Sequence, residues 1–257
     1  MTSLANADSD AILSVELDER SYPIHIVQGG LDGLGNALAM GMEGGPLVVI
    51  SDTTVEDLYG DIAASSLVSA GFAPRMYSFA AGEAHKTVDT WHELTNRVLA
   101  DGVTRSTPVL ALGGGVVGDI AGLVAATTLR GLPFIQVPTT LLAMVDSAVG
   151  GKVGVNTPLG KNLVGAFHQP IFVYAALETL RTLEDAEMRS GLGEVVKHGA
   201  IGDDALFALC EQQIVAIRAR DPKVLRWLVE KSCRVKSHVV SKDERENGIR
   251  AILNFGH

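Results

Sequence analysis

Three consecutive glycines, Gly113, Gly114 and Gly115, separate an apolar run from a segment of helical character. The run at residues 108–112 predicts a strand, so we expect a strand–turn–helix unit here. Backbone amides at such a turn lack partners within the helix, and the helix dipole adds partial positive charge. The turn therefore predicts a phosphate-binding site. It lacks GxGxxG spacing, although the GGxxG pattern at residues 114–118 gives similar backbone freedom, and a tight structural turn is the alternative.

Two lysines follow in an otherwise glycine-rich and apolar stretch. Lys152 comes after Gly150 and Gly151, where a backbone and a ligand can approach closely. Lys161 precedes Asn162, whose amide can orient a carboxylate or phosphate oxygen. These residues favour an anion-binding enzyme site, and the alternative is a pair of exposed loop lysines.

Glu194 and Lys197 are separated by one helical turn and share a face. An exposed ion pair at this spacing would contribute only a few tenths of a kcal/mol, about 0.2–0.5. Because the neighbouring residues are small or apolar, we expect the pair to point into a pocket. We expect His198 on a different face, in a structural role.

The composition narrows the class of protein. The chain has 257 residues, of which 47% are hydrophobic and 20% charged, so we expect a folded globular protein. The formal net charge of −9 disfavours nucleic acid and anionic membranes as partners but permits a small anionic substrate. Two cysteines do not make a disulfide framework, and no signal peptide or membrane-spanning run is evident, so we expect a cytoplasmic protein.

The elements that position these residues follow from the hydrophobic patterns. Residues 11–28 alternate as in a β-hairpin, with a turn near residues 18–22. Apolar runs at 46–51 and 75–79 predict strands, and residues 53–71 between them predict a helix with its cap at 51–53. Residues 51–53, 80–86 and 113–119 all follow predicted strands, so we expect them to converge at one sheet edge.

The C-terminal part has a different character. Residues 203–219 and 222–240 show helical spacing, and Pro222 suits a helix start. A further apolar segment begins at residues 249–253, and the chain stops there, within an element. We predict an α/β fold in which a Rossmann-like, doubly wound parallel sheet is followed by a truncated, all-helical domain.

Taken together, several motifs resemble the 3-dehydroquinate synthase family of sugar phosphate cyclases. The resemblance runs from about residue 45 to the last residue. Its motifs are Gly82-Glu83 with Lys86, GGGVVGD at 113–119, VPTTLLAMVDSAVGGKVGVN at 137–156, GKNLVGAFHQP at 160–170, GLGEVVKHG at 191–199 and DERENGIRAILNFGH at 243–257.

The resemblance implies an NAD-binding α/β domain at residues 1–180 and a partial α-helical, metal- and substrate-binding domain at 181–257. The implied cofactors are NAD and Zn²⁺ or Co²⁺. The residues implied to contact NAD are Asp52, Gly82, Glu83, Ala84, His85, Lys86, Gly115, Val116, Val117, Gly118, Asp119, Thr139, Thr140, Lys152, Lys161, Thr179, Leu180, Arg181 and Thr182.

The resemblance also implies two of the metal ligands, Glu194 and His257. The residues implied to act on the substrate are Asp146, Lys152, Lys197, Lys236, Arg250, Asn254, Asn162 and Arg130, of which Arg130 would reach a neighbouring subunit's phosphate site in a homodimer. The implied substrate is 3-deoxy-D-arabino-heptulosonate 7-phosphate, and the products are 3-dehydroquinate and phosphate. The implied reaction combines transient oxidation by NAD, β-elimination of phosphate, re-reduction and an intramolecular aldol closure.

One departure from the family pattern carries an expectation of its own. The family has a second histidine four residues beyond the position of His257 and a third metal ligand further on, and catalytic zinc usually takes three protein ligands. For the chain as given we therefore expect weak metal binding and little turnover.

Three alternative functions remain open at this point. The first is another sugar phosphate cyclase, such as a 2-deoxy-scyllo-inosose or 2-epi-5-epi-valiolone synthase, whose substrate lacks the carboxylate. The second is an iron- or zinc-dependent alcohol dehydrogenase, and the third is an inactive fragment that only binds NAD or a partner subunit.

Overall fold

The computed structural model describes residues 9–256, which divide into two compact units. The first unit comprises residues 9–30, 139–150 and 173–256, and the second comprises residues 31–138 and 151–172. Both mix helices with strands, which confirms the predicted α/β class. Within the units, parallel strand pairs predominate over the antiparallel pairs β1–β2 and β7–β8.

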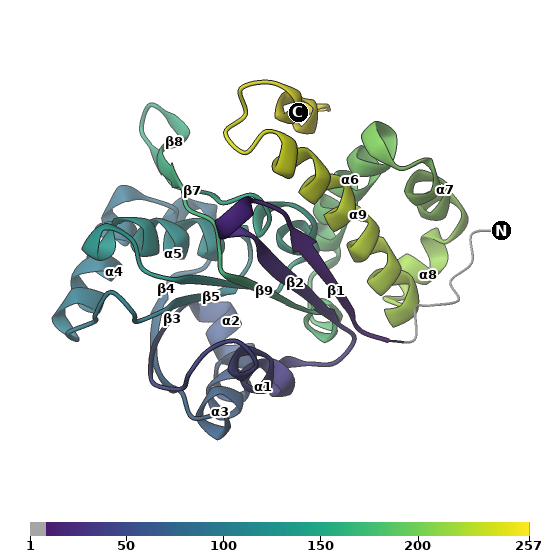
Figure 1. Ribbon diagram of the computed structural model, residues 1–257. Helices are drawn as coiled ribbons and strands as arrows, with labels where there is room; N and C mark the ends of the chain where they lie inside the picture. Colours follow the sequence, from purple (N-terminus) through teal and green to yellow (C-terminus); the bar gives the residue numbers. More distant parts are fainter. Residues whose placement is uncertain (1–8, 257) are drawn as a thin grey trace. The chain divides into compact units, whose positions relative to one another are not determined.

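The second unit is built on four parallel strands in the order β6–β5–β3–β4. Their bounds are Pro46–Asp52 (β3), Ala73–Phe79 (β4), Val109–Gly113 (β5) and Phe134–Pro138 (β6). Every residue of β5 is buried, as expected for a strand covered on both faces. Figure 1 shows α4 and α5 on one side of these strands and α1 and α3 on the other, the doubly wound arrangement predicted from the sequence.

The helices of the second unit alternate with its strands. They are η2 (Leu31–Gly33), α1 (Leu34–Ala39), α2 (Thr53–Val55), η3 (Glu56–Gly60), α3 (Asp61–Ser69), η4 (Glu83–His85), α4 (Val88–Ala100), α5 (Gly115–Thr127) and η5 (Thr128–Arg130). Asp52 begins the first of the helices after β3, and its side chain accepts a hydrogen bond from the amide of Val55. The cap predicted at residues 51–53 is thus confirmed.

The carboxyl ends of these strands meet at one edge. Asp52 pairs with Phe79 across β3 and β4, and Ser51 pairs with Leu112 of β5. The segments that follow, at residues 80–86 and 113–119, therefore leave the sheet on the same side as Asp52, which confirms their predicted convergence.

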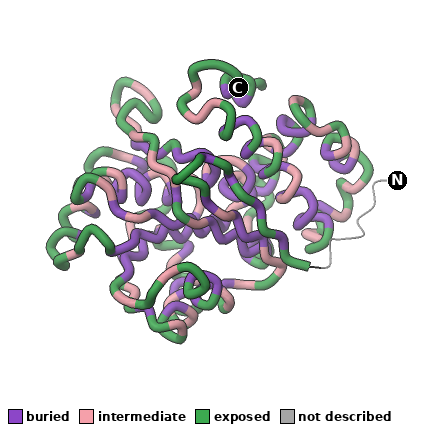
Figure 2. The backbone as a smooth tube through the Cα atoms, viewed as in Figure 1, coloured by how far each residue is buried: buried purple, intermediate pink, exposed green. Residues whose placement is uncertain are grey.

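A two-stranded hairpin completes the second unit. Strands β7 (Lys152–Thr157) and β8 (Gly160–Phe167) pair antiparallel, and β7 packs against α5. Lys152 and Lys161 therefore lie in strands, and both are exposed. Figure 2 shows that the tip of this hairpin is exposed, and Leu159 there is 91% exposed.

The first unit contains the predicted N-terminal hairpin. Strands β1 (Ala11–Val15) and β2 (Tyr22–Val27) pair antiparallel around the turn η1 (Asp18–Arg20), and β2 pairs parallel with β9 (Phe172–Ala176). Alternate residues of β1 are buried, and helix α9 packs against both strands of the hairpin.

Helices form the rest of the first unit. They are η6 (Ala143–Ser147), η7 (Leu177–Arg181), α6 (Asp185–Gly202), α7 (Asp204–Gln212), α8 (Ile214–Arg218), α9 (Pro222–Lys242) and η8 (Ile249–Asn254). Pro222 occupies the first turn of α9, as the sequence predicted, and the structure adds that the Asp221 side chain caps that helix. Among the described residues, no helix is long and apolar enough to cross a membrane.

The compact units are not contiguous in sequence. The helices after residue 180 share their unit with β1, β2 and β9, because one apolar cluster includes Leu13, Ile24 and Val173 together with Leu228 of α9. The predicted division at residue 180 into an NAD-binding and a metal-binding part concerns function and not compactness, and it stays a prediction.

Candidate functional site

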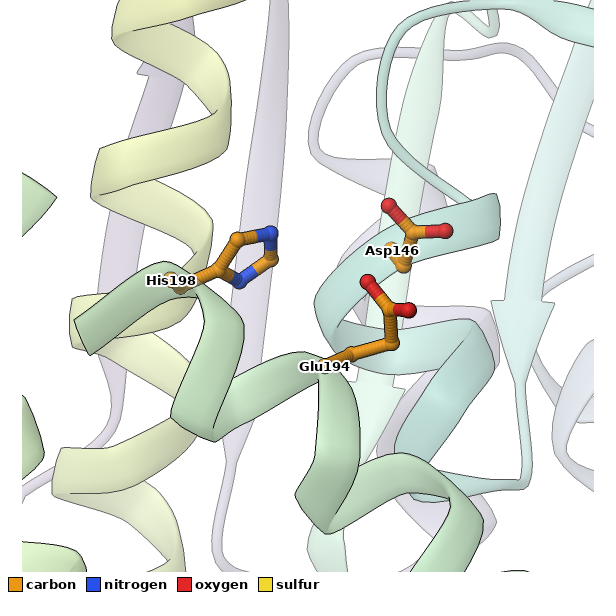
Figure 3. Close-up of side chains that lie close together, drawn as sticks. All are labelled: Asp146, Glu194 and His198. Atoms are coloured by element: carbon orange, nitrogen blue, oxygen red, sulfur yellow. The ribbon is translucent and has the colours of Figure 1, made fainter. Parts of the chain in front are cut away.

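A carboxylate–histidine group lies inside the first unit. Asp146 comes from η6, and Glu194 and His198 come from α6. One potential ligand atom from each of the three residues lies within 4.8 Å of the other two. Figure 3 shows the two carboxylates facing each other and the imidazole on the same side of α6 as Glu194. Carboxylate oxygen and imidazole nitrogen are donors that suit Zn²⁺ and Co²⁺, so this trio could hold a metal ion.

His198 corrects one expectation from the sequence. It lies on the same face of α6 as Glu194, because residues four apart in a helix stand one above the other. The side chain is fully buried, and neither ring nitrogen has a hydrogen-bond partner among the described residues. Burial, followed by the charge of Lys236, lowers the pKa of His198 to about 4, so the ring is neutral at pH 7.

Two buried lysines neutralise the carboxylates of this trio. Lys197 forms an ion pair with Glu194. Both side chains of this i,i+3 pair are largely buried, as expected for a pair that points inward. Lys236 Nζ lies 2.5 Å from Asp146 Oδ1 and 2.6 Å from its backbone oxygen. Burial raises the pKa of Asp146, but the charge and hydrogen bond of Lys236 lower it more, to about 2.

Arg250 lies in the same unit and is 2% exposed. Its Nη2 donates to the Gly150 carbonyl at 3.0 Å, and its Nη1 donates to the Glu244 carbonyl. Burial lowers the pKa of Arg250, although neighbouring acidic groups oppose the shift. Like Lys197 and Lys236, Arg250 is a buried cation within an acidic protein.

The remaining predicted residues of the first unit lie in turns. Thr139 is buried, and Thr140 accepts a hydrogen bond from the Ala143 amide. Thr179 is buried in η7, Leu180 is buried beside it, and Arg181 and Thr182 are exposed. Asn254 is exposed and donates to Glu246 at 2.9 Å. His257 lies outside the described residues.

A second polar cluster lies in the second unit and is centred on Lys86. This ammonium is 5% exposed, forms an ion pair with Asp119 of α5, and lies 2.6 Å from Asn162 Oδ1 of β8. Asn162 has a φ of +57°, a left-handed conformation that asparagine tolerates better than most residues. The structure thus brings together three residues that the sequence predicted for cofactor and substrate.

Side chains around Lys86 join the β7–β8 hairpin to the segment at 82–87. Asn156 donates to Glu83 Oε1 at 2.9 Å and accepts from the Asn162 amide at 3.0 Å. Lys161 Nζ lies 3.7 Å from the same Glu83 oxygen. Gly82 has a φ of +110°, which only glycine adopts readily, and Ala84 and His85 are exposed beside it.

The glycine turn forms the strand–turn–helix unit predicted from the sequence, and its role in phosphate binding stays a prediction. Helix α5 begins at Gly115 after the N-cap residue Gly114, whose position offers no side-chain cap to the first amides. Val116 and Asp119 are half-buried, and Val117 and Gly118 are buried against the sheet. Arg130 is exposed at the end of η5 with a φ of +69°.

Some residues of these clusters were not singled out from the sequence. The i,i+4 spacing of Glu194 and His198 within one helix was a signal that could have indicated the trio. Tyr22, Asn156 and Glu244 gave no such signal, because their partners Gly150, Glu83 and Arg20 lie far away in the sequence.

Comparisons with known proteins agree with the motifs. The family model for the 3-dehydroquinate synthase N-terminal domain matches residues 76–190, and the model for its C-terminal domain matches residues 191–257. The chain belongs to the 3-dehydroquinate synthase family. A 3-dehydroquinate synthase from Pelotomaculum thermopropionicum is 50% identical over 245 residues, which are 95% of this chain and 66% of that protein. The chain thus spans slightly less than two thirds of the length of this relative.

Solved structures of sugar phosphate cyclases share the fold. One is 2-epi-5-epi-valiolone synthase from Streptomyces hygroscopicus subsp. jinggangensis 5008 with NAD⁺ and Zn²⁺ bound, at a TM-score of 0.86 and 30% identity over 94% of this chain and 67% of that one. Another is a 2-deoxy-scyllo-inosose synthase complexed with carbaglucose-6-phosphate, NAD⁺ and Co²⁺, at a TM-score of 0.86 and 28% identity over 96% of this chain and 68% of that one.

Proposed function

We propose that this chain carries the cofactor-binding and much of the substrate-binding machinery of a 3-dehydroquinate synthase, a carbon–oxygen lyase. The substrate would be 3-deoxy-D-arabino-heptulosonate 7-phosphate, and the products would be 3-dehydroquinate and phosphate. The observation that carries the proposal is the set of buried cations, Lys197, Lys236 and Arg250, in the unit that holds the carboxylate–histidine trio. Such a set suits a ligand that is both a phosphate and a carboxylate.

The second unit supplies residues that fit NAD. The first amides of α5 can donate to a phosphate, and the glycine at N-cap leaves the backbone accessible. Asp119 and Lys86 hold each other in place below this turn. We assign the predicted NAD contacts of this unit to the segments at 82–86 and 115–119, with Asp52 at the neighbouring strand end and Lys152 and Lys161 in the hairpin. Thr139, Thr140 and residues 179–182 complete the proposed set.

The trio in the first unit fits a metal ion. His198 has two buried ring nitrogens without hydrogen-bond partners among the described residues, and a neutral imidazole is the form that ligates metals. Glu194 is common to this trio and to the ligand pair predicted from the family motifs, in which His257 is the second member. We propose Zn²⁺ or Co²⁺ as the occupant. When bound, NAD would supply a hydride acceptor and the metal a Lewis acid at the substrate hydroxyl.

The cationic side chains would orient the substrate. We assign the substrate carboxylate to Arg250 and Lys236, because a guanidinium matches a carboxylate with two parallel hydrogen bonds. Lys197, Asn162 and Lys152 are our candidates for the phosphate, and Arg130 is our candidate for the phosphate site of a neighbouring subunit. Asn254 and Asp146 are our candidates for the hydroxyl groups. Asp146 stays ionised at pH 7, so it accepts hydrogen bonds from Lys236 and keeps that ammonium in place.

Holding the substrate in one orientation accounts for much of the proposed catalysis. Well-oriented intramolecular steps gain roughly 7–11 kcal/mol relative to free reactants. Rigid ion pairs such as Lys236–Asp146 suit this task, since their geometry is set before the ligand arrives.

The proposal is tested by release of inorganic phosphate from 3-deoxy-D-arabino-heptulosonate 7-phosphate, together with calorimetric binding of that substrate. NAD and Zn²⁺ are supplied, and the control omits the metal. We expect saturable, metal-dependent binding of the sugar acid, and any phosphate release without net formation of NADH. Net NADH would indicate an alcohol dehydrogenase instead. NAD binding without any binding of the sugar acid would contradict the proposal and favour an inactive fragment.

The second candidate function is another sugar phosphate cyclase, which the solved structures of that group favour. Its substrates lack the carboxylate. Tighter binding of carbaglucose-6-phosphate than of 3-deoxy-D-arabino-heptulosonate 7-phosphate would support this candidate, because Arg250 and Lys236 would then have no carboxylate to bind.

A further inference from the structure

Tyr22 lies at the start of β2, far in sequence from the proposed substrate residues, and is 1% exposed. Its hydroxyl oxygen accepts a hydrogen bond from the Gly150 amide at 3.0 Å. Gly150 in turn presents its carbonyl to Arg250 Nη2, also at 3.0 Å. A single glycine therefore connects the Tyr22 hydroxyl with the Arg250 guanidinium.

Gly150 has no room for a side chain. Its φ is +97°, and a Cβ atom built there would lie 2.6 Å from Arg250 Nη2. Glycine is thus required both by the backbone conformation and by the close approach of the guanidinium. The hydrogen bond that the Gly150 amide donates to the Tyr22 hydroxyl holds this glycine in the conformation that points its carbonyl at Arg250.

The second anchor of Arg250 also depends on the N-terminal hairpin. Arg250 Nη1 donates to the Glu244 carbonyl, and the Glu244 carboxylate accepts two hydrogen bonds from Arg20 of η1, at 2.5 and 2.7 Å. The Arg250 amide is fixed as well, because it donates to Asp243 at 3.0 Å. A bidentate arginine–carboxylate pair sets both distance and orientation.

The charges agree with this geometry. Burial raises the pKa of Tyr22, and the positive charge of Arg250 opposes that shift. The phenol is therefore neutral at any ordinary pH and remains able to hydrogen-bond to the Gly150 amide.

We infer that Tyr22 and Arg20 of the β1–β2 hairpin are positioning residues, which hold the Arg250 guanidinium in the orientation that binds the substrate carboxylate. This inference rests on the proposed function. A guanidinium recognises a carboxylate only when its planar fork is correctly aligned, so freedom at either anchor weakens that contact. The phosphate of the substrate meets other side chains and is not affected.

The first test replaces Tyr22 with phenylalanine, which removes one oxygen atom and keeps the ring. Binding is measured by calorimetry with 3-deoxy-D-arabino-heptulosonate 7-phosphate and with carbaglucose-6-phosphate, which carries a phosphate but no carboxylate. We expect Tyr22→Phe to weaken binding of the sugar acid about three- to tenfold, the range for a lost neutral hydrogen bond. Binding of carbaglucose-6-phosphate should stay within about twofold, because it does not use Arg250.

Tyr174→Phe is the matched control. Tyr174 is also a buried strand tyrosine of the first unit, and its hydroxyl donates to the Gly30 carbonyl at 3.1 Å. We expect it to leave the affinity for both ligands unchanged. If Tyr22→Phe weakens the binding of both ligands equally, the role of Tyr22 is only structural and the inference is wrong.

The second variant, Arg20→Ala, acts at the surface and does not disturb the core. The Arg20 side chain is 59% exposed, as is that of Arg234 at 58%, which also pairs with a glutamate through two hydrogen bonds. We expect Arg20→Ala to weaken the binding of only the ligand with a carboxylate, and Arg234→Ala to weaken the binding of neither ligand. Unchanged affinity in both Tyr22→Phe and Arg20→Ala would overturn the inference. A wild-type chain that binds no sugar acid would instead contradict the proposed function on which it rests.

Discussion

At the residue scale, the two units contain buried lysines that are paired with carboxylates, so removing one partner leaves the other charge unpaired. Lys197, Lys236 and Lys86 are each less than a tenth exposed, and each contacts a carboxylate. Desolvation makes an unpaired charge in such a place costly, so each pair persists as a unit. His198 differs from these residues, because it is buried in its neutral form.

His198 makes the stability of the metal-free protein depend on pH. The pKa of this ring falls from 6.5 to about 4 on folding, so the unfolded chain binds the proton more readily between these values. The stabilisation is complete above pH 6.5 and is lost as the pH falls towards 4, with a total change on the order of 3 kcal/mol. We expect His198→Gln to flatten this part of the profile in chelator-treated protein.

Urea unfolding at several pH values measures that profile. His238→Gln is the matched control, since His238 is an exposed histidine of α9. A wild-type profile that is already flat between pH 4 and 6.5 would show that the ring is not buried in its neutral form.

At the element scale, α6 carries Glu194, Lys197 and His198, so its distance from η6 sets how these side chains lie relative to Asp146. Gly191 allows the close approach of α6 to the segment before η6. A Cβ atom at Gly191 would lie 2.7 Å from both the Leu141 side chain and the Leu142 amide nitrogen. The helix can approach the segment before η6 this closely only because residue 191 has no side chain.

Gly191→Ala is expected to destabilise the protein by about 1–3 kcal/mol, the usual cost of overpacking. At Gly193, two residues further along the same helix, a Cβ atom would have no neighbouring atom within 4 Å. Gly193→Ala should stabilise the protein by about 0.5–1 kcal/mol through helix propensity alone. Denaturant midpoints of the two variants measure the difference, and shifts of the same sign would contradict it.

At the scale of the whole molecule, a net charge of −9 coexists with the buried cations Lys197, Lys236 and Arg250 in the first unit. The two observations are compatible, because buried charges act at short range in a medium of low dielectric constant, whereas surface charges are screened by salt. The overall negative charge is therefore compatible with the proposed binding of a small anion by these cations.

Removal of metal is expected to separate the two binding functions. The trio of Asp146, Glu194 and His198 lies in the first unit, and the glycine turn before α5, our proposed phosphate site, lies in the second. We expect chelator treatment to weaken binding of 3-deoxy-D-arabino-heptulosonate 7-phosphate about tenfold or more. The affinity for NAD should change less than about threefold.

Calorimetry before and after treatment measures both affinities. Added Co²⁺ should restore binding of the sugar acid, whereas Mg²⁺, which prefers six oxygen ligands, should not. Equal losses for NAD and the sugar acid would be inconsistent with this arrangement.

Features that depend on short stretches of chain could be predicted from the sequence. The N-terminal hairpin, the strand–turn–helix unit at Gly113, the cap at Asp52 and the start of α9 at Pro222 each follow from local patterns, and the structure confirms them. The family motifs were equally local, since each is a run of adjacent residues.

Which of these residues contact one another depends on the tertiary structure. Arg250 reaches Tyr22 through Gly150, and Lys86 reaches Asn162, across separations of 76 residues and more. No periodicity encodes such contacts, because they depend on how strands and helices pack. The position of His198 is the instructive case: its spacing from Glu194 was visible in the sequence, but its burial without hydrogen-bond partners among the described residues depends on the packing around α6.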